Sequence, residues 1–409
     1  MHGDYKELTR DRAITNAPVP EYLYVPLSQH IGAPAVPLVA RGDRVKRGQL
    51  IGSADAFVTA NVHSPVSGEV VEQVRIINPQ GRTVDALKIK NDFQDELDPA
   101  LKTYGVPDEL STDMLREIIR EMGLVGMGGA AFPTHVKVSP PKDKKVDTLI
   151  LNAAECEPYL NADYRLLLEH PNEIVLGLRL MARATRAVWV VVGLEDNKKS
   201  VMAGLQAAGI EEFARIAVMP AVYPAGAEKV LVKKAVGRQV PKKGLPLDVG
   251  VVVVNVGTVY QLARSIQTGL PLLERVVTVS GEFANPGNYL TRLGTLYQDV
   301  ARLPDNYDQK DYRIVSGGPM MGFAVSRLDI PVTKGTSGLL LLRSQIFKES
   351  NCIRCARCVD ACPLELLPYQ DRGLDECMEC GLCAFVCPAR KYLVQQVRQQ
   401  KAAKKLQAK

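Results

Sequence analysis

Residues 352–363 read Cys352-Ile-Arg-Cys355-Ala-Arg-Cys358-Val-Asp-Ala-Cys362-Pro363, and residues 377–388 read Cys377-Met-Glu-Cys380-Gly-Leu-Cys383-Ala-Phe-Val-Cys387-Pro388. Both stretches follow the pattern C-x2-C-x2-C-x3-C-P, and together they hold eight of the nine cysteines of the chain. Three thiolates at this spacing can wrap one four-iron cubane, while the fourth cysteine reaches the other cluster. The pattern therefore predicts a ferredoxin-like segment with two [4Fe–4S] clusters.

The spacing also predicts that the ligands are crossed between the motifs. One cluster takes Cys352, Cys355, Cys358 and Cys387, and the other takes Cys377, Cys380, Cys383 and Cys362. Disulfides are disfavoured in a reducing compartment. A zinc site does not usually carry a third cysteine and a Cys-Pro pair in duplicate. Electron transfer is thus the indicated chemistry, and the remote Cys156 is not a predicted ligand.

Outside these motifs the composition is that of a globular protein. The chain has 409 residues, of which 46% are hydrophobic and 23% charged, so two to four domains are expected and general disorder is excluded. The net charge of +6 arises from residues 390–409, which hold seven Lys or Arg and no acid. The rest of the chain is close to neutral, so no nucleic-acid partner is expected.

Nothing in the sequence predicts a membrane span. No apolar run approaches the ~20 residues that cross a bilayer, and residues 1–7 lack the apolar segment of a secretory signal. We therefore expect a cytoplasmic location. The basic tail at residues 394–409 predicts a solvated terminal helix, with an anchor to a partner or to anionic lipid as the minority interpretation.

Residues 22–92 predict short strands, because Val and Ile alternate with polar residues between Gly and Asp turns. The G-D-x-V-x-x-G-Q turn at 42–49 and the S-P-V-S-G-x-V segment at 64–70 resemble the biotinyl/lipoyl-carrier sandwich. Carriers present a lysine at the tip between these segments, whereas residues 54–57 here read Ala-Asp-Ala-Phe. We expect a structural or docking module without a swinging arm.

From about residue 110 apolar runs alternate with helical patterns. The predicted strands are 148–151, 187–192, 215–219 and 250–254, and the predicted helices are 111–121, 164–184, 198–208, 227–236 and 259–267. This alternation favours a mostly parallel sheet that is covered on both faces. Ligands bind such sheets at the carboxyl ends of the strands. Short strands return between residues 275 and 345.

A glycine-rich loop, Gly-Met-Gly-Gly-Ala-Ala-Phe-Pro at 126–133, follows the first helix. It fits the G-x-G-x-x-A dinucleotide pattern, but a Rossmann turn needs a preceding strand. Its N–H groups can still approach a phosphate; a tight turn between domains is the alternative. Polar loops at 152–158, 223–229 and 255–258 lie at strand ends or before a helix. Together the four loops predict a cofactor pocket.

These segments resemble the flavin- and NADH-binding subunit of respiratory complex I. Almost end to end, the chain is similar to the family of C subunits of the Rnf ion-translocating ferredoxin:NAD⁺ oxidoreductases. Besides the cysteine motifs, the blocks that carry the resemblance are residues 6–9, 26–34, 126–137, 152–159, 316–322 and 334–338.

The resemblance implies FMN and NAD(H) as cofactors beside the clusters. Its flavin candidates are Gly126, Gly128, Gly129, Asn152, Glu155, Gly226, Asn255 and Thr258. The nicotinamide nucleotide is expected to stack near Phe132, with Lys137, Glu157 and Glu228 as polar contacts. Contacts at Met127 and Ala227 are not implied, because complex I carries other residues there.

The resemblance also implies a multidomain α/β-plus-β architecture. The expected order is a barrel-sandwich domain (1–105), an FMN/NADH-binding α/β domain (106–270), a β-grasp module of the soluble-ligand-binding type (271–345), a 2[4Fe–4S] ferredoxin-like domain (346–393) and the basic tail (394–409). The β-grasp module is expected to brace the flavin domain against the clusters.

The implied function is that of a peripheral subunit at the cytoplasmic face of the cell membrane. It would pass electrons between ferredoxin-derived clusters and NAD(H) through FMN, as part of an oxidoreductase that is also a translocase. Its partners would be the other Rnf subunits, including an iron–sulfur subunit that exchanges electrons with ferredoxin. No side chain is expected to act as a catalytic acid or base. Two alternatives are a cobalamin reductase of the diol-utilisation type and a non-catalytic iron–sulfur adaptor.

Overall fold

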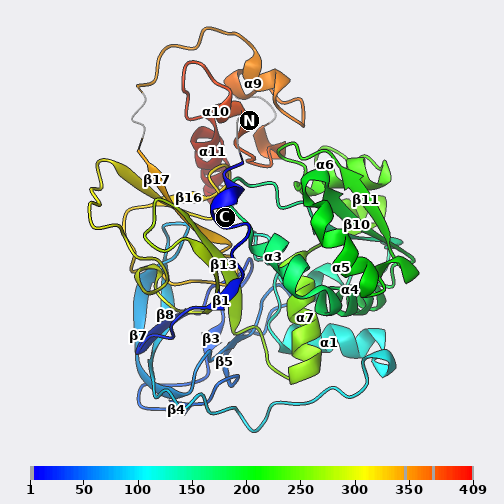
Figure 1. The fold of residues 1–409 in the computed structure, drawn as a ribbon, viewed down its shortest axis with the longest axis vertical. Coiled ribbons are helices and arrows are strands. Elements are labelled where there is room, and N and C mark those ends of the chain that lie inside the picture. The colour runs from blue at the N-terminus through cyan, green and yellow to red at the C-terminus, as the bar shows by residue number, and fades with distance from the viewer. Residues whose placement is uncertain (1–3, 345–347, 371–373, 408–409) are drawn as a thin grey trace.

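The computed structural model describes residues 4–344, 348–370 and 374–407 (Figure 1). Two small antiparallel sheets form the N-terminal part. The strand order of the first sheet is β2 (Tyr22–Pro26), β8 (Thr83–Asn91), β7 (Gly68–Ile77) and β4 (Arg44–Val45). The strand order of the second sheet is β3 (Val36–Pro37), β5 (Leu50–Ser53) and β6 (Val62–His63). Leu23, Val25, Ile51 and Ile89 fill the space between the sheets. The predicted barrel-sandwich is confirmed.

A four-stranded parallel sheet forms the centre of the next part. Its order is β11 (Arg215–Met219), β10 (Trp189–Glu195), β9 (Thr148–Ala153) and β12 (Val251–Asn255). Side chains alternate along β9: Leu149 and Leu151 share a core with α4 (Pro171–Thr185) and α7 (Val256–Thr268), whereas Ile150 packs with α6 (Glu228–Val236) on the other face. The predicted sheet covered on both faces is confirmed.

Two predicted helices in this region differ from the structure. The predicted helix 164–184 is two helices, α3 (Ala162–Glu169) and α4, because the residue before Pro171 is disfavoured in the helical conformation. The predicted helix 198–208 begins as a 3₁₀ helix, η3 (Asp196–Val201), and continues as α5 (Met202–Ala207). The expected α1 (Thr112–Glu121) is present, with the Ser111 side chain accepting the N–H of Met114.

A six-stranded mixed sheet follows. Its order is β1 (Ile14–Asn16), β14 (Gly287–Arg292), β13 (Glu274–Gly281), β17 (Gly338–Arg343), β15 (Tyr312–Ser316) and β16 (Phe323–Val325). Strand β1, drawn in blue in Figure 1, pairs in parallel with β14 at the edge of the sheet. Residues 14–16, expected within the barrel-sandwich domain, therefore contribute to this sheet instead. The domain boundaries remain predictions.

The cysteine-rich segment lies at one end of the molecule (Figure 1) and carries α9 (Arg357–Asp360), α10 (Leu382–Phe385) and α11 (Leu393–Gln407). The tail is helical, as predicted, but it is not fully solvated, because one face of the helix packs on the cysteine-rich segment. Leu393 and Val397 are buried, Lys401 donates to the Cys377 carbonyl, and Lys404 pairs with Asp375 at 2.7 Å. The boundary expected between residues 345 and 346, and the expected ends of the chain at residues 1 and 409, lie outside the described residues.

The remaining short elements are α2 (Thr134–Lys137), α8 (Tyr297–Val300), η1 (Lys6–Leu8), η2 (Pro107–Glu109), η4 (Ile210–Glu212), η5 (Pro246–Val249), η6 (Pro368–Gln370) and η7 (Leu374–Glu376). None of the helices in the described residues has the length and apolar character needed to cross a bilayer.

Lys334 lies fully buried where three parts of the chain meet. Its ammonium Nζ donates to the carbonyls of Asn61 at 2.6 Å and Gly123 at 2.7 Å, and its backbone N–H donates to Gln29. Burial lowers the pKa of Lys334 to about 7 from the ordinary value of 10.5. Between these values the unfolded chain binds more protons than the folded chain. The contribution of Lys334 to stability therefore rises with pH.

We expect the stability difference between the wild type and Lys334→Met to grow in favour of the wild type as pH rises. The expected slope is about 1 kcal/mol per pH unit between about pH 7.5 and about pH 9.5. Thermal unfolding of both proteins across this range measures it, and the difference cancels the titration of other groups. A difference that stays constant or shrinks with pH would contradict the prediction.

Candidate functional site

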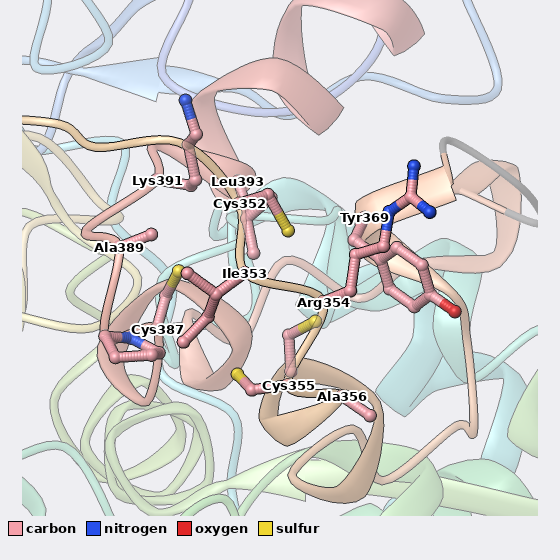
Figure 2. A pocket seen from close by; sticks show the side chains of 12 residues that line it. Cys352, Ile353, Arg354, Cys355, Ala356, Tyr369, Cys387, Ala389, Lys391 and Leu393 are labelled. Carbon is pink, nitrogen blue, oxygen red and sulfur yellow. The ribbon is translucent and has the colours of Figure 1, made fainter.

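The four cysteines predicted for the first cluster line one cavity. Figure 2 shows the sulfur atoms of Cys352, Cys355 and Cys387 turned toward the space between them, and Cys358 also lines it. Cys387 belongs to the second motif, so the fold brings the predicted crossed set together. Cys352 and Cys355 are exposed, which places this cavity at the surface of the molecule.

The second predicted set also gathers in one place. Burial, and after it the neighbouring Cys377, Cys380 and Cys362, raises the pKa of the Cys383 thiol to about 12. Bound iron would reverse this effect, because a coordinating thiol is deprotonated. The backbone N–H of Glu379 donates to Cys377 Sγ at 3.3 Å, a contact of the kind that tunes a cluster's potential. Cys380 and Cys383 are buried.

Each set has the donors of a [4Fe–4S] cluster, which four cysteine thiolates bind. Within residues 4–344, 348–370 and 374–407, no three His, Cys, Asp or Glu side chains are grouped so that they could hold a metal ion. The ninth cysteine, Cys156, packs against Gly226 instead.

The glycine-rich loop lies over the carboxyl ends of β9 and β12. The strand register places Asn152 of β9 beside Asn255 of β12. An added Cβ at Gly128 would lie 3.5 Å from Asn255 Nδ2. Thr258 is buried and holds the loop by accepting the N–H of Met127 on its Oγ1 at 2.9 Å. The loop is therefore anchored at its base.

The tip of the loop is open. Gly126 donates its N–H to the Phe132 carbonyl at 2.8 Å and closes the loop. Gly128, Gly129 and Ala130 between them are exposed, and Gly129 has a φ of +106°. The backbone of these three residues is thus accessible to a ligand.

A buried acid stands behind Asn255. The side-chain Nδ2 of Asn255 donates to Asp163 Oδ2 at 2.6 Å. Burial, and after it the neighbouring Glu155 carboxylate, raises the pKa of Asp163. Asn255 Oδ1 is buried and has no hydrogen-bond partner in the described part of the chain. Because an unpaired buried oxygen is costly, it suits a site that a ligand completes.

The loop before α6 forms a second side of the site. Asn152 Nδ2 donates to the Gly226 carbonyl at 2.8 Å, and an added Cβ at Gly226 would lie 2.3 Å from the carbonyl oxygen of Ala154. Lys137 Nζ forms an ion pair with Glu228 Oε1 at 2.7 Å. Glu228 is the first residue of α6 and is exposed, so Lys137 or Glu228 can give up its partner in the ion pair and bind a ligand instead.

Two predicted contact residues are engaged with backbone. The Glu155 carboxylate accepts the N–H groups of Asp163 and Tyr164 at 3.0 and 3.1 Å and so holds the first turn of α3. The Glu157 carboxylate accepts both N–H groups of residues 320–321 at 3.0 and 2.8 Å. Burial raises the pKa of Glu157 to about 7. In this structure neither carboxylate is free, and their roles as cofactor contacts stay predictions.

The candidate site meets the second cysteine set through Tyr223. The Tyr223 hydroxyl donates to the Cys380 carbonyl at 2.6 Å, and the bond is buried. Tyr223 lies three residues before Gly226. A cluster held by Cys380 would therefore lie beside the candidate cofactor site.

These features fit a nucleotide cofactor. Exposed glycine N–H groups close to the start of the 13-residue helix α7 suit a phosphate. The close approach at Gly226 and the unpaired Asn255 oxygen suit a planar group that lies against backbone. The residues present thus fit a flavin nucleotide beside two clusters.

Three family models match the chain. Residues 119–264 match the Nuo51 FMN-binding domain, residues 2–94 match the RnfC barrel sandwich hybrid domain, and residues 349–369 and 374–390 match a 4Fe-4S binding domain.

Two curated relatives match most of the chain. The C subunit of the proton-translocating ferredoxin:NAD(+) oxidoreductase complex of Clostridium ljungdahlii is 45% identical over 369 residues, which cover 89% of this chain and 81% of that one. The C subunit of the Na(+)-translocating complex of Acetobacterium woodii is 40% identical over 389 residues, 92% and 88% of the two chains. The chain belongs to the RnfC family. A solved NAD+-reducing [NiFe]-hydrogenase aligns over 60% of this RnfC-family chain and 49% of its own, at 24% identity and a TM-score of 0.49.

The expected fold class and cofactors of the RnfC-family chain are confirmed. Its matched domains are an FMN-binding domain and a 4Fe-4S binding domain, and the two relatives are named as subunits of ferredoxin:NAD(+) oxidoreductase complexes. Sequence reasoning missed Asp163 and Arg275. The buried Arg275 guanidinium donates to the carbonyls of Met127 at 3.3 Å and Lys334 at 2.5 Å, and so holds the glycine loop. The only signal in the sequence was an arginine next to the apolar run that begins at Val276.

Proposed function

We propose that this chain is the peripheral, flavin- and cluster-bearing subunit of a membrane ion-translocating electron-transport complex. It passes electrons between ferredoxin-derived [4Fe–4S] clusters and NAD(H) through FMN. The observation that carries the proposal is the buried contact between Tyr223 and Cys380, since it joins the candidate flavin site to a cluster site. Membership in the RnfC family supports the complex as the setting.

The partners in the proposal are the other subunits of an Rnf-type complex. One of them is an iron–sulfur subunit that exchanges electrons with ferredoxin, and the chain docks on the cytoplasmic face of the membrane. The two cysteine sets suggest the order of transfer. The buried set, with Cys380, is the proximal set because it touches the flavin side. The exposed set, with Cys352 and Cys355, is the distal set and faces the partner.

Bound FMN supplies the exchange between the two-electron hydride of NADH and one-electron clusters. The chain's own residues bind and orient. The open glycine loop and the start of α7 hold the phosphate, and Asn152 and Asn255 bind from the strand ends. Phe132 stacks on the nicotinamide nucleotide, and the Lys137–Glu228 pair binds its polar groups. No side chain needs to move a proton.

Anaerobic purification and reconstitution test this proposal. We expect about one FMN and about eight irons per chain, and we expect NADH to bleach the flavin. The measurements are flavin and iron content and the absorbance change on adding NADH. Because no side chain is proposed to act as a catalytic acid or base, we expect bleaching without a strong pH optimum.

The two rival functions give different results in the same experiment. An iron–sulfur adaptor would carry about eight irons, no flavin and no response to NADH. A cobalamin reductase would transfer electrons from NADH to cob(II)alamin as the isolated chain. Either result would refute the proposal.

A further inference from the structure

One tyrosine hydroxyl joins the flavin side of the molecule to the cluster side. Tyr223 and Cys380 are each 8% exposed, and their hydrogen bond of 2.6 Å is shielded from water. Tyr223 belongs to a tight turn in which the Ala225 N–H donates to the Val222 carbonyl at 2.8 Å. This turn leads directly into Gly226, a candidate flavin contact. The hydrogen bond to Cys380 thus starts three residues away from a candidate flavin contact.

A second contact reaches the same turn of the cluster segment. Residues 317–322 form a loop, here called the bridging loop, between β15 and β16. Glu157 holds the bridging loop on the flavin side by accepting two of its N–H groups. On the other side Gly381 has a φ of +84°, and an added Cβ there would lie 2.6 Å from the Met320 carbonyl oxygen. Only glycine fits this approach.

The cluster segment is thus clamped at two adjacent residues. Tyr223 bonds the carbonyl of Cys380, and the bridging loop packs on Gly381. The hydrogen bond from Tyr223 is directional and ties a ligating residue to the flavin domain. The contact between the bridging loop and Gly381 is a close van der Waals approach without a hydrogen bond. The rate of electron transfer falls as the distance between the two cofactors grows, so the position of a ligating residue affects that rate.

We propose that Tyr223 is a positioning residue, whose hydroxyl fixes the proximal cluster at the distance from the flavin that electron transfer requires. The inference rests on the proposed function. Bound FMN would supply two steps: it would take two electrons from NADH as a hydride, and it would then pass them one at a time to the proximal cluster, each moving on through the distal cluster before the next follows. Tyr223 takes no part in the bond changes. Tyr223 affects only the rate of electron transfer from the flavin to the proximal cluster.

The test compares Tyr223→Phe with Tyr164→Phe in the reconstituted protein. Tyr164 is also 8% exposed, and its hydroxyl bonds Ser200 Oγ at 3.0 Å, so the control removes a similar bond elsewhere. After mixing with NADH, Tyr223→Phe should bleach its flavin at the wild-type rate, while the electron-paramagnetic signal of the reduced cluster appears about tenfold more slowly. Tyr164→Phe should match the wild type in both steps.

Hydrogen exchange gives a readout independent of turnover. In Tyr223→Phe the amides of residues 380–386 should exchange about fivefold faster, the factor that corresponds to one lost hydrogen bond. A general loss of stability would instead slow flavin bleaching or lower the iron content. Gly381→Ala pushes the cluster segment away from the opposite side and should reproduce the slow cluster reduction.

The inference is overturned if Tyr223→Phe and Gly381→Ala both reduce the proximal cluster at the wild-type rate and both exchange the amides of residues 380–386 at the wild-type rate. A wild-type protein whose flavin does not respond to NADH would refute the proposed function instead. Even then the exchange rates of residues 380–386 decide whether Tyr223 holds the cluster segment in place.

Discussion

Replacing Cys362 with serine is expected to abolish reduction of any cluster by NADH, although Cys362 belongs to the first motif. The fold groups Cys362 with Cys377, Cys380 and Cys383, the set that Tyr223 touches. Losing one of four ligands should empty that site, so iron falls from about eight to about four per chain. The distal cluster remains but loses its connection to the flavin. Iron content and the electron-paramagnetic signal after NADH addition measure both effects, and flavin bleaching should persist.

Cys387→Ser is the matched variant with the opposite outcome. It should also halve the iron content, but the cluster that remains is the one beside Tyr223, and NADH should still reduce it. Cys156→Ser removes a thiol outside both sets and should keep about eight irons. If Cys362→Ser retains a cluster that NADH reduces while Cys387→Ser does not, ligation is within each motif and the crossed assignment is wrong.

Gly128→Val is expected to lower the flavin content by about tenfold without unfolding the chain. Gly128 is exposed, and a Cβ there would make ordinary contact with Asn255 at 3.5 Å. The backbone therefore tolerates a side chain, but the branched methyl groups project over the strand ends where the flavin is proposed to bind. Flavin released on denaturation, counted per chain, measures the effect.

A valine placed elsewhere serves as the control. Gly204 lies in α5, where an added Cβ would also stand 3.5 Å from its nearest neighbour, Pro171. Gly204→Val should bind flavin as the wild type does, and both variants should keep the wild-type melting temperature of the flavin-free protein within a few degrees. Normal flavin content in Gly128→Val would place the flavin away from this loop.

Much of the candidate site follows from local sequence. The cysteine spacing predicts both cluster sets, because a short stretch of chain can wrap a cubane only at certain separations. The apolar runs before Asn152 and Asn255 predict that these residues meet at one edge, because parallel strands align their carboxyl ends. The predicted helix 164–184 missed the break before Pro171, although proline restricts the residue that precedes it.

Other features required the tertiary structure. Glu155 and Glu157 read as cofactor contacts, but their carboxylates bind the start of α3 and the bridging loop. The basic tail reads as solvated, yet Leu393 and Val397 are buried against the cluster segment. The sequence around a charged or apolar residue is the same whether its side chain is exposed to solvent or packed in a contact. Only the tertiary structure shows which of these two environments the side chain occupies.

The order of residues along the chain is enough to establish which chemistry this protein carries: eight cysteines in two repeats, and a glycine loop with polar strand ends. Which cluster lies beside the flavin side depends instead on the packed chain, where Tyr223 reaches Cys380 across 157 residues. Such a contact has no spacing rule, because it arises from how two parts of the chain that lie far apart in the sequence pack together. Ligand sets are local and can be read from spacing, whereas the distances between cofactors depend on domain packing.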